Sequence, residues 1–149
     1  QLAAGMQLPN SGNVFVSLKD ADKEQFLDSA EKLVEMGFTI LATDGTHRFL
    51  AAAGIASRRI NKVREGRPHI GDALKNDEVA LLINTPSGKN PRADEVCIRT
   101  QAVLDNIPLV TTVWAANAVV TAIAALRAKR PSVRTIQEYN ADTHGDNVL

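Results

Sequence analysis

VALLINTPSGK, residues 79–89, is the most informative stretch of this sequence, because a buried apolar run opens there into a polar turn that contains glycine. Two other apolar runs end in the same way: VFV at 14–16 leads into residues 17–23, and FTILA at 38–42 leads into TDGT at 43–46. Turns that follow parallel strands gather at the carboxyl edge of their sheet, where backbone amides can bind an anion. The sequence therefore predicts a site for a small anionic molecule.

Strand-like and helix-like runs alternate along the chain over short connections. The first helix is expected to be capped by Asp20 or Asp22 and to end at Gly37. Strands are expected at residues 14–18, 38–42, 59–63, 79–83 and 108–113, and the other helices at about 48–53, 70–75, 93–106 and 115–128. This alternation predicts an α/β fold, a three-layer, doubly wound sheet of five parallel strands in the order 3-2-1-4-5. The switch point then falls between strands one and four, flanked by Ser17 and Asn84.

The composition indicates one globular domain without a strong electrostatic field. Apolar residues make up 44% of the 149 residues, and Lys plus Arg equals Asp plus Glu, at 17 each. We therefore expect no nucleic acid and no membrane among its partners. Residues 1–12 are interpreted as a linker, 13–140 as the domain and 141–149 as a polar tail. With no signal peptide and no membrane span in the pattern, the expected location is cytoplasmic. Cys97 is predicted to be a small core residue.

Two turns offer groups that could hold a phosphate. Thr43 and Thr46, together with the amides of a helix start, can donate to phosphate oxygens, or the same residues can simply cap a helix. Lys23 and Lys62 are either solvated surface lysines or the positive partners of that anion. Lys23 stands in the first turn of a helix, where a positive charge is unfavourable unless an anion compensates it.

The remaining polar turns also have both a functional and a structural interpretation. Asn84 and Thr85 can bind a base or sugar edge or can serve the turn itself, and Pro86 removes one backbone donor. His69 and Asp72 invite an acid–base role, although a capping aspartate beside a loop histidine is the interpretation we favour. The pattern contains no metal site and no Ser/His/Asp triad.

Taken together, five motifs resemble the methylglyoxal-synthase-like domain family. The likeness is greater to the carboxy-terminal allosteric domains of bacterial carbamoyl-phosphate synthetase large subunits, and it covers residues 13–140. The motifs that carry it are VSLKDADKE at 16–24, ATDGT at 42–46, NKVREGRPHI at 61–70, LINTPSGK at 82–89 and Thr111-Thr112. The run NKVxEGRPH and the loop INTxSG are its specific parts.

The resemblance implies an effector-binding module rather than a catalyst. It implies contacts with three kinds of ligand group: the effector phosphate (Lys23, Thr43, Thr46, Lys62), the ribose or base (Ser17, Asn84, Thr85) and an ornithine site (Thr111). The implied effectors are UMP, which inhibits, and IMP and ornithine, which activate. The implied partners are the rest of the large subunit and the glutaminase small subunit. The parent synthetase makes carbamoyl phosphate for pyrimidine and arginine biosynthesis. It uses ATP with Mg or Mn, while this domain is expected to hold no cofactor.

Two residues depart from the family pattern, and two other functions compete. Pro86 replaces a threonine that contacts nucleotide in relatives, and Asp44 stands where histidine can occur. A negative charge beside a phosphate weakens binding unless it points away. One alternative is a methylglyoxal synthase acting on dihydroxyacetone phosphate. Asp72 lies near the catalytic aspartate of that enzyme, but the GGDQ pattern is absent. The other alternative is an assembly surface whose pocket no longer responds.

Overall fold

The computed structural model describes residues 8–62, 69–86 and 93–129, so the tail at 141–149 and the loop beyond Pro86 lie outside it. The elements in chain order are β1 (Asn13–Ser17), α1 (Asp20–Lys23), η1 (Glu24–Phe26), α2 (Leu27–Glu35), β2 (Thr39–Ala42), α3 (Asp44–Ala52), β3 (Arg58–Arg59), α4 (Ile70–Lys75), β4 (Val79–Asn84), α5 (Ala93–Leu104), β5 (Leu109–Val110) and α6 (Val113–Lys129).

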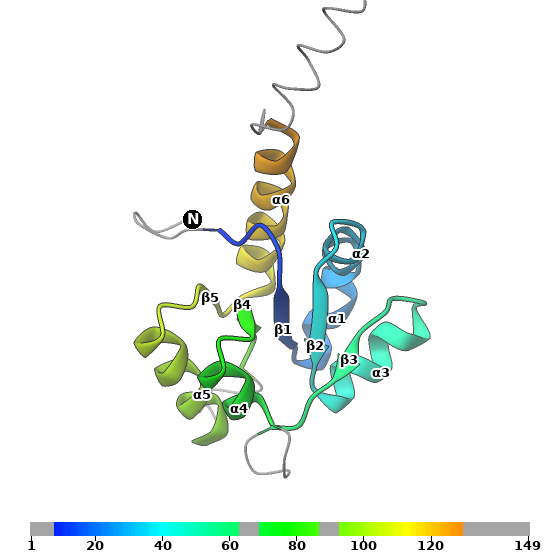
Figure 1. Ribbon diagram of the computed structural model, residues 1–149. Helices are drawn as coiled ribbons and strands as arrows, with labels where there is room; N and C mark the ends of the chain where they lie inside the picture. Colours follow the sequence, from blue (N-terminus) through cyan, green and yellow to red (C-terminus); the bar gives the residue numbers. More distant parts are fainter. Residues whose placement is uncertain (1–7, 63–68, 87–92, 130–149) are drawn as a thin grey trace, which may run out of the picture.

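The five strands form one parallel sheet in the order β3-β2-β1-β4-β5 (Figure 1). This confirms the order predicted from the alternation of strands and helices. β1 lies at the centre, where Val14 pairs with Ile40 of β2 and Leu81 of β4. Because a central parallel strand has no exposed face, its three apolar residues are fully buried.

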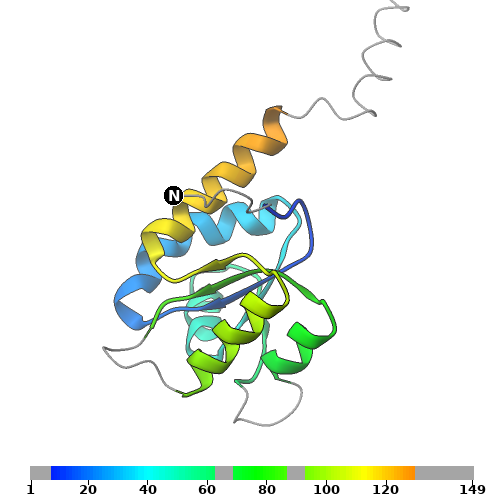
Figure 2. The same cartoon turned by 90° about the vertical axis from the view of Figure 1, so that its left-hand side faces the viewer.

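Side chains that alternate along β1 point to two separate cores. Val14 and Val16 pack with Phe26, which η1 supplies, and with residues of α2, α3 and α6. Phe15 packs on the opposite face with residues of α4 and α5, Leu74 among them. Figure 2 shows the resulting three layers, with α2 and α6 on one side of the sheet and α4 and α5 on the other.

Several element boundaries differ from the prediction. α3 begins at Asp44 rather than at Arg48, because the glycine of the turn adopts helical geometry instead of interrupting the helix. β3 contains only Arg58 and Arg59, followed by an isolated bridge between Asn61 and His69. β5 is likewise shorter than expected, with two residues instead of six.

The ends of the helices follow the expected chemistry in part. Gly37 ends the α2 region as predicted, in a left-handed conformation (φ 90°) that glycine adopts without strain. The predicted cap at Asp20 or Asp22 is wrong, because Lys19 holds the N-cap position of α1 and its side chain makes no capping bond. No helix within the described ranges combines the length and apolar character that crossing a membrane requires.

Candidate functional site

A polar cavity of about 600 Å³ lies at the carboxyl edge of the sheet, above β1, β2 and β3. Its size falls within the range of small-molecule sites in proteins. The lining residues come from the end of β1 and the start of α1, from the start of α3 and from the segment after β3: Ser17, Leu18, Lys19, Asp20, Ala21, Lys23, Thr43, Asp44, Gly45, Thr46 and Lys62. The cavity therefore gathers Ser17 and all four residues predicted to hold a phosphate.

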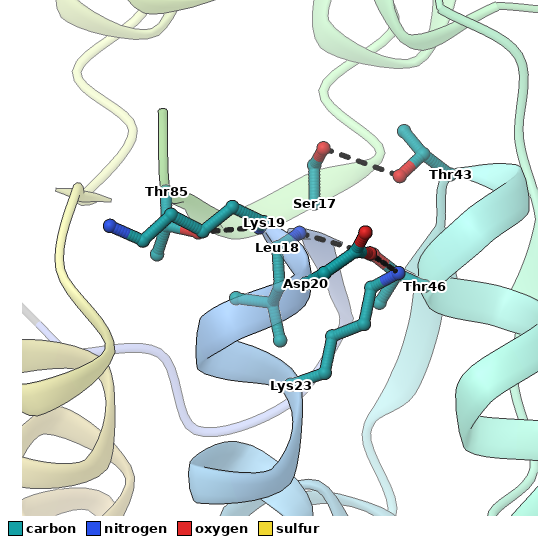
Figure 3. Close-up of polar contacts among 8 residues, drawn as sticks. All are labelled: Ser17, Leu18, Lys19, Asp20, Lys23, Thr43, Thr46 and Thr85. Atoms are coloured by element: carbon teal, nitrogen blue, oxygen red, sulfur yellow. Dashed lines mark hydrogen bonds and ion pairs between the residues drawn. The ribbon is translucent and has the colours of Figure 1, made fainter. Parts of the chain in front are cut away.

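Hydrogen bonds of hydroxyl groups link the turn after β1 to the turn after β2 within the cavity. The Thr46 hydroxyl oxygen accepts a bond from the buried Leu18 amide at 3.0 Å, and the Thr43 hydroxyl donates to Ser17 Oγ at 3.2 Å (Figure 3). Because Thr46 Oγ1 is used as an acceptor, its proton is left to donate to another oxygen. Ser17 Oγ likewise accepts a bond from Thr43, so the proton of the Ser17 hydroxyl is also left to donate.

The start of α3 adds positive character to the cavity. Thr43 is the N-cap residue, with extended backbone angles (φ −65°, ψ 160°), and its side chain makes no capping bond to the helix. The first residues of this nine-residue helix thus line the cavity, and the Thr43 side chain does not cap their amides. Amide groups in this position carry partial positive charge and favour a bound anion.

Lys23 places its ammonium group next to the start of α3. Its side chain is only 12% exposed, and Nζ is 2.6 Å from Asp20 Oδ1. A Cβ atom added at Gly45 would come within 3.3 Å of this Nζ, which shows how closely the ammonium approaches the helix start. The hydrogen bond and charge of Lys23 lower the pKa of the Asp20 carboxyl group.

Asp44, the acidic departure from the family pattern, is paired with two arginines. One carboxylate oxygen lies 2.7 Å from Arg48 Nη2, and the other lies 3.3 Å from Arg59 Nε. These pairs offset its negative charge at the rim of the cavity. The expected penalty against a phosphate is correspondingly reduced.

Three predicted site residues are not among those that line this cavity. Thr85 is buried directly after the end of β4. Its hydroxyl oxygen accepts from the Lys19 amide at 2.9 Å, and its own amide donates to the Ser17 carbonyl at 3.0 Å. Asn84 is buried beside it, and within the described part of the chain its Nδ2 has no hydrogen-bond partner. Thr111 is exposed, just after β5 and two strands from β1.

The described residues that line the cavity follow β1, β2 and β3, whereas most of the loop that follows β4, on the other side of the predicted crevice, lies outside the described residues. The bonds of Thr85 join the ends of β1 and β4, and the cavity lies over β1, β2 and β3. Sequence reasoning considered Asp20 only as a helix cap and missed its ion pair with Lys23, although a spacing of three residues is a signal for such a pair on one helix face.

His69 and Asp72 lie apart from the cavity. The Asp72 carboxylate accepts a weak bond from the His69 amide at 3.4 Å at the start of α4, which fits the capping role favoured from the sequence. Both residues line a second, smaller cavity of about 170 Å³. Among the described residues, no three His, Cys, Asp or Glu side chains form a group able to hold a metal ion. Cys97 is exposed on α5, so its predicted core position is wrong.

A parallel sheet with a polar, cationic cavity at its carboxyl edge is the architecture of α/β ligand-binding domains. A family model of the MGS-like domain matches residues 25–111, more than half of the chain. The chain therefore belongs to the MGS-like domain family.

Curated relatives named carbamoyl phosphate synthase large chain are similar over almost the whole sequence. The protein from Mesorhizobium japonicum is 46% identical over 95% of this chain, and the one from Myxococcus xanthus is 45% identical over 93%. The chain spans only 12% and 13% of these two relatives. A carboxy-terminal section of the large chain from Aquifex aeolicus is 43% identical over 94% of this chain, which spans 27% of it.

Among solved structures, a methylglyoxal synthase from Elizabethkingia anophelis has a similar fold. The TM-score is 0.55, the likeness covers 83% of this chain and 81% of the other, and 15% of the residues are identical. At this level of identity the likeness establishes the fold alone.

Proposed function

We propose that this chain is the carboxy-terminal regulatory domain of a carbamoyl phosphate synthase large chain, and that its cavity binds the phosphate of a nucleotide such as UMP or IMP. The observation that carries the proposal is the meeting of Lys23, Lys62 and the start of α3 in one polar cavity. Two ammonium groups and a helix start are the chemistry that a phosphate dianion requires.

The relatives support the larger context. Each of them carries the name of the synthase large chain, and in the Aquifex aeolicus protein the similar region belongs to a carboxy-terminal section. Under this proposal the ATP-dependent ligase chemistry belongs to the longer parent chain and its glutaminase partner. Thr111 then faces an ornithine site on a part of the domain separate from the nucleotide cavity.

Regulation in this proposal is a coupling between two sites. UMP inhibits the parent enzyme only if it binds one state of the whole synthase more tightly than another. The cavity contributes the binding energy, and the contacts of the domain with the rest of the large chain contribute the difference between states.

Calorimetric titration of the chain with UMP, IMP and uridine tests the binding proposal. We expect both nucleotides to bind and uridine not to bind at the same concentration, because uridine lacks the phosphate. Lys62→Ala should weaken UMP roughly tenfold, since a tenfold change corresponds to about 1.4 kcal/mol, within the range of a charged hydrogen bond. Equal binding of UMP and uridine would contradict the proposal.

Gly45→Ala should weaken the binding of UMP while leaving the stability of the fold nearly unchanged. The added Cβ would lie 3.3 Å from Lys23 Nζ, the far end of a flexible side chain, so the ammonium moves while the backbone stays. We expect the unfolding free energy to stay within about 1 kcal/mol of the original, because alanine also favours the helix. UMP affinity should fall by roughly fivefold, on the scale of a displaced charged contact. Thr121→Ala, at an exposed position of α6 outside the cavity, controls for the gain of a helical alanine.

The geometry gives no separate support to the methylglyoxal synthase alternative. That alternative gives Asp72 the catalytic role at the substrate site. In the structure Asp72 contacts His69 at the start of α4 and is not among the residues that line the main cavity.

A further inference from the structure

The ammonium group of Lys23 is positioned for an anion even when no ligand is bound. Its side chain is 12% exposed and its Nζ lies against Gly45, close to the positive end of α3. A cation at the positive end of a helix is unfavourable unless an opposite charge compensates it. The ammonium group of Lys23 therefore requires a negatively charged group beside it.

Asp20 supplies that partner from the protein itself. Its Oδ1 lies 2.6 Å from Lys23 Nζ, and Figure 3 shows the two side chains meeting above the start of α1. Asp44, the other acid that lines the cavity, is paired with Arg48 and Arg59 instead. Among the described residues, Asp20 is thus the acid that neutralises Lys23.

The two members of this pair differ sharply in how firmly they are held. The Asp20 side chain is 96% exposed, and its contact within the described structure is the one to Lys23. A rotation about its side-chain bonds would therefore move it into solvent at little packing cost. Lys23, by contrast, is enclosed and would stay in place to meet a new anion.

We propose that Asp20 is an internal competitor for the ligand phosphate: it occupies Lys23 in the empty cavity and must swing out before a phosphate can bind there. The inference rests on the proposed function, since it concerns the same cavity. It makes Asp20 a determinant of affinity, because part of the binding energy of every phosphate is used to displace the carboxylate. It also keeps the empty cavity from attracting anions that bind Lys23 less strongly than Asp20 does.

Asp20→Asn tests the proposal, with UMP and inorganic phosphate as probes in calorimetric titration. Asparagine keeps the size of the side chain and suits a helix start, but it lacks the charge. We expect UMP to bind about three to ten times more tightly, on the scale of an exposed ion pair together with the lost repulsion. Asp20→Glu, which keeps the carboxylate, should bind like the original chain. Asp28→Asn, an exposed acid on α2 outside the cavity, controls for the change in net charge.

A double-mutant cycle separates competition for Lys23 from general repulsion. In a chain that already carries Lys23→Met, Asp20→Asn should change UMP affinity by less than twofold, because there is no ammonium left to compete for. An equal gain in both backgrounds would overturn the competitor role. So would unchanged affinity of Asp20→Asn in a chain that binds UMP, and this result would leave the proposed function standing. If the original chain and Asp20→Asn both failed to bind UMP, IMP and inorganic phosphate, the proposed function would fall and the inference with it.

Discussion

Replacing Lys23 by methionine should weaken UMP binding by about 30-fold or more, while the domain remains folded. A hydrogen bond to a charged group contributes about 1.5–3 kcal/mol, and this ammonium lies in a largely enclosed position beside the start of α3. Methionine retains the apolar stem that packs in the site, so the loss should come from the charge. Calorimetric titration measures the affinity, and thermal unfolding checks the fold.

Lys32→Met is the matched control for this experiment. Lys32 is exposed in the last turn of α2 and is not among the residues that line the cavity, yet its loss changes the net charge by the same amount. If both variants weakened UMP equally, the effect would reflect overall charge, and the assignment of Lys23 to the phosphate would be wrong.

Thr46→Val should damage both the fold and the site. Valine has nearly the same shape but cannot accept the hydrogen bond that the buried Leu18 amide donates at 3.0 Å. A buried donor without a partner costs about 2 kcal/mol, which lowers Tm by roughly 4–8 °C in a domain of this size. The hydroxyl that would donate to the phosphate is lost at the same time, so UMP affinity should also fall.

Two variants, Thr46→Ser and Thr121→Val, serve as controls for Thr46→Val. Serine keeps the oxygen and should preserve most of the stability and the binding. Thr121 is exposed on α6, far along the chain from the cavity residues, and its change to valine should leave both quantities nearly unchanged. A Tm of Thr46→Val equal to that of the original chain would contradict the role given to the Leu18–Thr46 bond.

The fold was predictable because its signals are local and repeat along the chain. The apolar runs around Val14–Val16 and Val79–Ile83 have no polar alternation, which is the mark of strands covered on both faces. The five strands, joined by short connections through helices, then allowed few topologies, and the expected order was correct. The short β3 and β5 were overestimated because only two residues of each pair with a neighbour.

The gathering of the lysines and threonines was also predictable in outline, since each follows or lies near the end of a strand. The exact place of the cavity was not. The base of the site includes contacts between distant residues, such as the bond between the Lys19 amide and the Thr85 hydroxyl, which joins residues 66 positions apart. No local pattern reports such a bond.

The acidic residues also show that local sequence patterns do not report contacts with distant residues. Asp44 was expected to oppose a phosphate, but its partners Arg48 and Arg59 come from one turn further along α3 and from β3. The prediction weighed the charge of Asp44 without these neighbours. The Asp20–Lys23 pair, by contrast, is local, and its spacing of three residues would have been sufficient to predict it.

A crystal structure of this chain with UMP would show directly whether the cavity binds the nucleotide phosphate. We expect the phosphate to lie in the cavity above β1, β2 and β3, with oxygens about 3 Å from Lys23 Nζ and the Thr46 hydroxyl, and with Asp20 turned toward solvent. A phosphate bound elsewhere on the domain, with the Lys23–Asp20 pair still closed, would contradict the account.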